Sequence, residues 1–206
     1  MDAEKSAFFL PLHCQLRQHD ASGFPPGLLQ LNYQSPADGL ADWAMLLPPG
    51  REVSRWLVVI HGHGSKGNQL YLRPDIRKHW LPHFLASGYG ILTPNLRGNA
   101  WMSPAAVQDL DALLNFLRQE FSAGQFFFIS GSMGATSNLI YAALRPSNVA
   151  GVVARGAVTD LAVYHAFCRL GADAPAPPGL PEGSLRRTAA IRAEIADSLE
   201  QHYGGT

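Results

Sequence analysis

The sequence has few cysteines, no net charge and no long apolar run, and each of these absences excludes a class of protein. Cys14 and Cys168 are the only cysteines among 206 residues. They lack metal-ligand spacing, so we expect two free, buried thiols rather than a disulfide framework. Sixteen basic residues balance sixteen acidic ones, which gives no reason to expect a nucleic acid or an anionic membrane as partner. Without a signal peptide or a run of about 18 apolar residues, the sequence predicts a cytoplasmic protein outside the membrane.

The sequence does contain short apolar runs that alternate with helical patterns. Its 206 residues, 47% of them hydrophobic, suit a single domain, 1–206, with a sizeable core. The predicted strands are 28–34, 43–47, 56–60, 90–93, 126–129 and 149–153, and the predicted helices are 75–86, 104–120, 133–144 and 185–202. Helices between the later strands imply parallel βαβ units. We therefore predict an α/β fold with a doubly wound, mostly parallel sheet after an antiparallel opening pair.

Two further segments carry local signals. The stretch 171–183 is rich in Ala and Pro and predicts an extended loop. The helix predicted over 104–120 begins with Ser103, a residue type that caps helices, followed by Pro104 in the first turn. We expect the Ser103 hydroxyl to cap this helix.

The candidate catalytic motif is Ser130-Gly-Ser-Met-Gly134, which joins a predicted strand directly to a predicted helix. Its apex is Ser132, and small residues flank the turn, as a strained strand-to-helix turn requires. Such a turn lifts the Ser132 hydroxyl clear of the sheet. It also directs the backbone N–H of Met133, near the helix N-terminus, at a developing oxyanion. The motif predicts a nucleophilic serine.

A second motif, His61-Gly-His-Gly64, follows the buried strand 56–60. This position predicts a second oxyanion donor, the backbone N–H of His63 or Gly64, with Gly62 and Gly64 against the substrate. We expect His61 to order the loop through hydrogen bonds. No third ligand accompanies His61 and His63, so we predict no metal site.

A third motif, Asn95-Leu-Arg-Gly98, follows the strand 90–93, where a sharp loop must leave the strand end. The planar guanidinium of Arg97 suits a structural function, in which it ties neighbouring loops together, better than it suits substrate binding.

These motifs resemble the α/β-hydrolase superfamily in order and spacing, as does the predicted helix with Asp109 and Asp111 that lies between the third motif and Ser132. In that superfamily the strand-turn-helix around the catalytic serine is called the nucleophile elbow. Among its branches, the sequence is most similar to prolyl oligopeptidase-type catalytic domains and their esterase relatives. The resemblance covers about residues 28–170, although the family would have Asp where Asn95 stands. It implies hydrolysis of a small-molecule ester or a peptide through an acyl-serine, without a cofactor.

The same resemblance implies that the acid and the histidine of a catalytic triad follow the seventh and eighth strands. No such strands are predicted after Asp160, so we expect the domain to be incomplete and to lack them. Asp160 and His202 are then the remaining candidates for acid and base. The sixth strand of the family's sheet would form an exposed apolar edge, which predicts pairing into a homodimer.

Three interpretations stay open at this point. The chain is a serine hydrolase with an incomplete site, a non-catalytic relative that binds a ligand or a partner, or an inactive fragment. The sequence does not favour a nucleotide-binding domain. The connection after the first parallel strand, 56–60, lacks the Gly-x-Gly-x-x-Gly motif of dinucleotide-binding folds, and the glycines of Gly62–Gly67 lack the spacing of a phosphate-binding loop.

Overall fold

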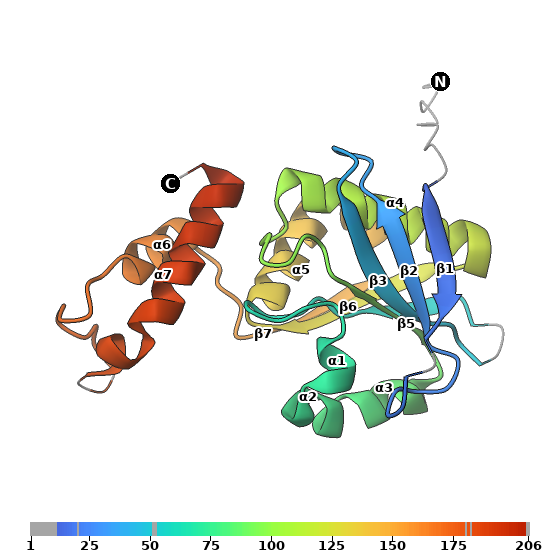
Figure 1. The fold of residues 1–206 in the computed structure, drawn as a ribbon, viewed down its shortest axis with the longest axis horizontal. Helices are drawn as coiled ribbons and strands as arrows, with labels where there is room; N and C mark the ends of the chain where they lie inside the picture. The colour runs from blue at the N-terminus through green and yellow to red at the C-terminus, as the bar shows by residue number, and fades with distance from the viewer. Residues whose placement is uncertain (1–11, 20, 51–52, 180, 182, 205–206) are drawn as a thin grey trace.

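The computed structural model describes residues 12–19, 21–50, 53–179, 181 and 183–204, and a seven-stranded sheet forms its centre (Figure 1). The strands are β1 (Cys14–Gln18), β2 (Leu29–Gln34), β3 (Ala41–Leu47), β4 (Arg55–Val58), β5 (Gly90–Pro94), β6 (Gln125–Gly131) and β7 (Gly151–Arg155). They lie in the order β1-β2-β3-β5-β4-β6-β7. The pairs β1–β2, β2–β3 and β3–β5 are antiparallel, whereas β5–β4, β4–β6 and β6–β7 are parallel. The predicted α/β fold, with an antiparallel opening and a parallel core, is confirmed.

Helices cover both faces of the sheet (Figure 1). They are α1 (Gln69–Leu72), α2 (Pro74–His79), α3 (Leu81–Ser87), α4 (Pro104–Phe121), α5 (Met133–Leu144), α6 (Leu161–Cys168) and α7 (Ser184–Tyr203), with a short 3-10 helix at Pro146–Asn148. Leu70 and Leu81 of the α1–α3 segment pack with Leu57 on one face. On the other face, Leu110 of α4 and Tyr141 of α5 pack with the core residues of β4 and β6. This burial on both faces explains the continuous apolar runs of β4 and β5.

Three sequence predictions need correction. The helix predicted over 75–86 is two helices, α2 and α3, which meet at Trp80. Pro82 lies in the first turn of α3, and in a continuous helix its ring would clash with the carbonyl of Lys78. Ser103 occupies the N-cap position of α4 but its hydroxyl makes no capping hydrogen bond. The strand predicted over 149–153 is β7, which begins and ends two residues later, and Val149 is instead the C-cap of the 3-10 helix at 146–148.

The two ends of the sheet have different surroundings. β1 is an edge strand that the sequence did not predict, because most of its residues are polar and exposed. β7 forms the opposite edge, and no strand follows it within the described residues. The sequence predicted that this last strand would form an exposed apolar edge, and Val153 of β7 is an apolar residue that is 58% exposed. Pairing of this edge with a second copy stays a prediction.

Beyond β7, α6 and α7 form a hairpin that extends away from the sheet (Figure 1). It packs on the sheet domain through Trp101 and Met133, which join Cys168, Ala196 and Leu199 in a separate apolar cluster. Trp101 also donates a hydrogen bond of 2.9 Å from its indole N–H to Ser198 of α7. Residues 171–179, between the two helices, form turns and irregular backbone as predicted. None of the helices in the described part of the chain is long and apolar enough to cross a membrane.

The two cysteines are free thiols, as predicted. Cys168 is buried in the hairpin cluster, whereas Cys14 on the edge strand β1 is only partly buried.

Candidate active site

Ser132 lies between the end of β6 and the first residue of α5, at the apex of the predicted strand-turn-helix. Its backbone has φ 56° and ψ −130°, a region that costs a residue with a side chain of the order of 1–3 kcal/mol. The side chain is exposed to solvent. The Ser132 N–H donates to the carbonyl oxygen of Arg155 at 2.9 Å, which holds the turn against β7. A strained, exposed serine therefore stands where the sequence placed the nucleophile.

Two small residues of the motif, Ser130 and Gly134, meet Ile60 in the segment that follows β4. A Cβ added at Gly134 would lie 2.1 Å from the carbonyl oxygen of Ile60, so no larger residue fits there. Ser130, which is 1% exposed, accepts a hydrogen bond of 2.9 Å from the Ile60 N–H through its hydroxyl. This contact gives the serine at the first motif position a structural function, because it satisfies a buried backbone donor.

The loop after β4 lies beside Ser132. A Cβ added at Gly62 would lie 3.9 Å from the Cβ of Ser132. The N–H of Gly62 donates to Gln69 Oε1 at 2.9 Å and the N–H of Gly64 donates to Asn99 Oδ1 at 2.8 Å. Of the two donors that the sequence left open, Gly64 is thus already engaged.

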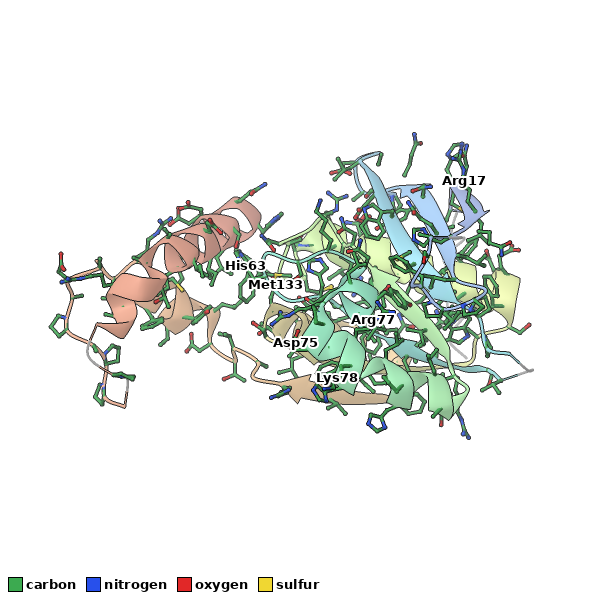
Figure 2. The ribbon with its side chains drawn as sticks, turned by 60° about the horizontal axis from the view of Figure 1, so that its bottom comes forward. Arg17, His63, Asp75, Arg77, Lys78 and Met133 are labelled. Atoms are coloured by element: carbon green, nitrogen blue, oxygen red, sulfur yellow. The ribbon has the colours of Figure 1, made fainter. Side chains whose placement is uncertain are left out.

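The backbone N–H of His63 has no acceptor among the described residues. Met133 is the first residue of α5, and the N–H groups of a helix's first turn have no acceptor within the helix. His63 and Met133 both lie near α7 (Figure 2). Of the predicted oxyanion donors, these two N–H groups are the ones without an acceptor among the described residues.

The two histidines of the loop differ in their surroundings. His61 is buried, with Nδ1 2.8 Å from the carbonyl oxygen of Gly62 and Nε2 3.0 Å from that of Asn95. Its predicted function in ordering the loop is confirmed. The His63 ring is half-buried, with its centroid 6.2 Å from that of Trp101. Burial lowers the pKa of His63, against an opposing attraction from Glu194 of α7.

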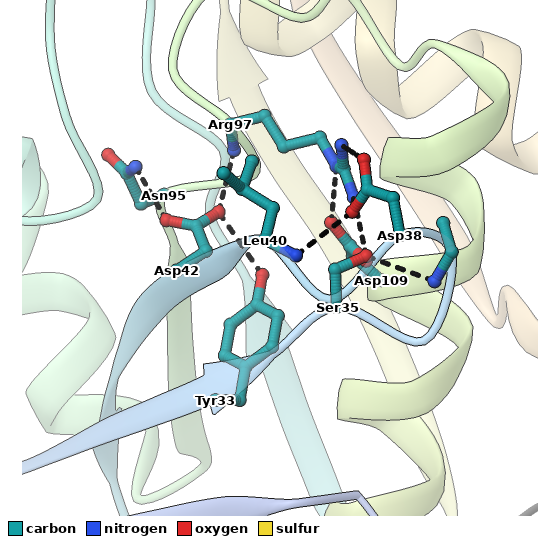
Figure 3. Close-up of polar contacts among 9 residues, drawn as sticks. Tyr33, Ser35, Asp38, Leu40, Asp42, Asn95, Arg97 and Asp109 are labelled. Carbon is teal, nitrogen blue, oxygen red and sulfur yellow. Dashed lines mark hydrogen bonds and ion pairs between the residues drawn. The ribbon is translucent and has the colours of Figure 1, made fainter.

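Arg97 holds three segments together (Figure 3). Its Nη1 and Nη2 atoms each lie 2.8 Å from a carboxylate oxygen of Asp38, and its Nε lies 2.7 Å from Asp109. Asp109, on α4, is 0% exposed and also accepts from Ser35 at 2.5 Å. Hydrogen bonds from Arg97 hold the pKa of the Asp38 carboxyl well below its usual range. The predicted structural function of Arg97 is confirmed.

Asn95, the departure from the family pattern, uses both ends of its amide, and Figure 3 shows the contact of its nitrogen with Asp42. The Nδ2 group donates to Asp42 at 2.8 Å, and Oδ1 accepts from the Gly67 N–H at 3.3 Å. Asp42 also accepts from the Arg97 N–H at 2.7 Å and from the Tyr33 hydroxyl at 3.3 Å. An ionised aspartate could accept from Gly67 but could not donate to Asp42.

We expect Asn95→Asp to destabilise the chain by about 1–3 kcal/mol, because it replaces a donor to Asp42 with a second carboxylate. Urea unfolding at pH 7 measures this loss, and the loss should shrink as the pH falls and one of the two carboxylates takes up a proton. Asn99→Asp is the control, because Oδ1 of Asn99 only accepts from Gly64 in the structure. Equal stability of Asn95→Asp and the parent chain would contradict the assignment.

The structure surrounds Asp160 and His202 with other partners. Asp160 is the N-cap of α6, and its Oδ1 accepts from the Val163 N–H at 2.9 Å. His202 lies in the last turn of α7, where burial and then the charge of Arg97 lower its pKa. Neither residue lines the cavity that contains Ser132. Their assignment as acid and base therefore stays a prediction that no contact with Ser132 supports.

That cavity has a volume of about 560 Å³ and opens beside the elbow. Its lining comes from the segment that contains α1 and α2, from Trp80 between α2 and α3, and from the residues at the ends of β6 and β7. These residues are Gln69, Arg73, Asp75, Ile76, His79, Trp80, Gly131, Ser132, Arg155 and Gly156. Sequence reasoning did not identify His79, Trp80 or Arg155 as site residues. No local motif marks them, since only the packing of α2 beside the sheet brings them to Ser132.

The fold and the elbow together define an α/β hydrolase. The family model of the alpha/beta hydrolase fold matches residues 55–174, and the chain belongs to this family. This range includes the His61 loop, the Arg97 loop and Ser132. A comparison with curated protein sequences found no match.

Solved structures share the fold at low sequence identity. Lipase A of Candida antarctica in its closed state superposes with a TM-score of 0.60 at 14% identity, over 86% of this chain and 45% of the lipase. A protein of unknown function from Staphylococcus aureus gives a TM-score of 0.51 at 16% identity, over 84% of this chain and 68% of that protein. The chain thus spans less than half the length of the lipase, and both similarities concern the fold alone.

Proposed function

We propose that this chain is a serine hydrolase that cleaves an ester bond through an acyl-serine at Ser132. The strained backbone of Ser132 at an exposed strand-to-helix turn carries the proposal. An exposed nucleophile beside two backbone N–H groups is the arrangement that acyl transfer needs. Of these two donors, Met133 starts α5 and His63 belongs to the loop that touches Ser132 through Gly62.

The chemistry of the two half-reactions follows from this arrangement. The Ser132 Oγ attacks the ester carbonyl carbon, and the oxyanion that forms accepts hydrogen bonds from the N–H groups of His63 and Met133. Collapse of the tetrahedral intermediate releases the alcohol and leaves an acyl-serine, which water hydrolyses to the acid. We favour an ester over the peptide that a prolyl oligopeptidase-type enzyme cleaves, because the structural neighbour with the higher TM-score is named a lipase.

The proposed activity is slow unless a base takes the proton of Ser132. Loss of the base of a serine triad costs on the order of 10⁴–10⁶ in rate. Neither Asp160 nor His202 lines the cavity at Ser132, and the imidazole that does is that of His79. We therefore test the reactivity of the serine itself with a reagent of high intrinsic reactivity.

Incubation with a fluorophosphonate should label the intact chain at one residue, Ser132, and Ser132→Ala should abolish the label. Mass spectrometry of the tryptic peptides locates the adduct. Ser122→Ala is the matched control, because Ser122 is also an exposed serine with a positive φ, 51°, but ends a helix instead of starting one. This control should label at the rate of the parent chain.

Two outcomes would overturn the proposal. A parent chain that stays unlabelled while its circular dichroism and thermal transition show it folded has no activated serine. A label that persists in Ser132→Ala belongs to another residue.

A further inference from the structure

Arg155 contributes a free positive charge to the cavity beside Ser132. Its side chain is exposed, and no hydrogen bond or ion pair of its guanidinium is found among the described residues. Its backbone carbonyl is engaged with the Ser132 N–H at 2.9 Å. The residue that fixes the elbow thus also carries an unpaired cation.

The register of the sheet places the Arg155 side chain on the α2 face. Arg155 lies opposite Gly131 in the β6–β7 pair, and side chains at paired positions project to the same face. A Cβ added at Gly131 would lie 3.8 Å from the Trp80 ring, so this face is the one that Trp80 and α2 cover. Val153, two residues before Arg155, projects to the same face and is exposed.

The other charges of the cavity cancel each other. Arg73 Nε lies 2.9 Å from Asp75 Oδ1, and this pair is exposed at the rim. Apart from His79, the residues with ionisable side chains that line the cavity are Arg73, Asp75 and Arg155. Because Arg73 and Asp75 neutralise each other, the single positive charge of Arg155 remains. A single positive charge complements a ligand with one negative charge better than a ligand with two.

The lining also supplies apolar surface. Trp80 and Ile76 line the same cavity, whose volume of about 560 Å³ falls within the usual range for small-molecule sites. A guanidinium presents a planar fork of donors that fits a carboxylate. A short hydrocarbon spacer on Trp80 would then join the carboxylate to the carbonyl at Ser132.

We propose that the cavity binds the free carboxylate of a dicarboxylic acid monoester, with Arg155 as the residue that selects for the anion and Ser132 as the nucleophile at the ester. This inference rests on the proposed hydrolase function and specifies its substrate class. Arg155 acts by binding the anionic end of the substrate, and the chemistry at the carbonyl stays with Ser132.

The probe is N-methylsuccinamate, in which an amide replaces the ester, compared with the uncharged N,N′-dimethylsuccinamide. Titration calorimetry on the intact chain should show that the anion binds at least about fivefold more tightly than the neutral analogue. Arg155→Gln should remove this preference without changing the affinity for the neutral analogue. Added salt should weaken binding of the anion to the parent chain.

Arg17→Gln is the matched control, since Arg17 is an exposed arginine on β1, the opposite edge of the sheet. It should keep the full preference for the anion. Equal affinity of the two probes for the parent chain would overturn the inference, and so would a preference that survives in Arg155→Gln. Fluorophosphonate labelling of the same samples tests the hydrolase function separately, because the label reports on Ser132 whether or not the anion binds.

Discussion

Gly134→Ala is expected to destabilise the chain by at least about 3 kcal/mol and to abolish fluorophosphonate labelling. The added methyl group would lie 2.1 Å from the carbonyl oxygen of Ile60 and 2.8 Å from that of His61. Both contacts are with backbone, so α5 must move away from β4 to make room. That movement displaces Ser132 and Met133 together, because they join β6 to α5.

Urea unfolding followed by circular dichroism measures the loss of stability. Gly171→Ala is the matched control, since a Cβ at Gly171 would meet nothing within 4 Å and its φ is not positive. That change should shift the free energy of unfolding by no more than about 0.5 kcal/mol. Equal stability of the two variants would show that α5 does not need the close approach to β4.

Arg97→Met is expected to cost about 3–5 kcal/mol, because it leaves the carboxylate of Asp109 buried without a counter-charge. The Arg97 side chain is 10% exposed and that of Asp109 is 0% exposed, so solvent does little to screen this pair. Asp109 keeps the Ser35 hydroxyl as a donor, which does not neutralise the charge. Urea unfolding at pH 7 measures the cost.

The pH dependence separates lost charge pairing from lost packing. A buried, unpaired carboxylate has a raised pKa, so the folded variant takes up a proton as the pH falls and recovers part of its stability. The double variant Arg97→Met/Asp109→Leu should recover most of the loss at pH 7. Arg17→Met, a change at an exposed arginine of β1, should have little effect at any pH. A pH-independent loss in Arg97→Met would contradict the ion-pair explanation.

The sequence predicted the elements of the sheet because their apolar runs are continuous and short. Each strand from β2 to β7 was expected, with ends that differ by at most two residues. β1 was not, because its residues are polar and exposed and its pairing with β2 depends on backbone hydrogen bonds. The break between α2 and α3 was also missed, although Pro82 offered a signal for it.

The strand-turn-helix at Ser132 could be predicted because its sequence pattern is local. A strand that turns sharply into a helix needs small residues within a few positions of the serine, so the motif around Ser132 can be read from consecutive residues. The hydrogen-bond partners of Arg97 were harder to predict, because Ser35 and Asp38 lie 62 and 59 residues away from it in the chain and Asp109 lies on α4. The need for an amide at Asn95 depends on Asp42, on a different strand.

The sequence by itself thus determined the α/β class and the strand-turn-helix at Ser132, and it placed the loop with the proposed second N–H donor after β4. Each of these depends on residues that are neighbours in the chain. Only the tertiary structure decided that Gly64 is engaged and His63 available, and that Asp160 and His202 do not line the cavity of Ser132. It also brought Arg155 and Trp80 into one cavity with Ser132. The physical reason is that a cavity is formed by side chains from separate elements, and their distances follow from packing and strand register, which no local pattern encodes.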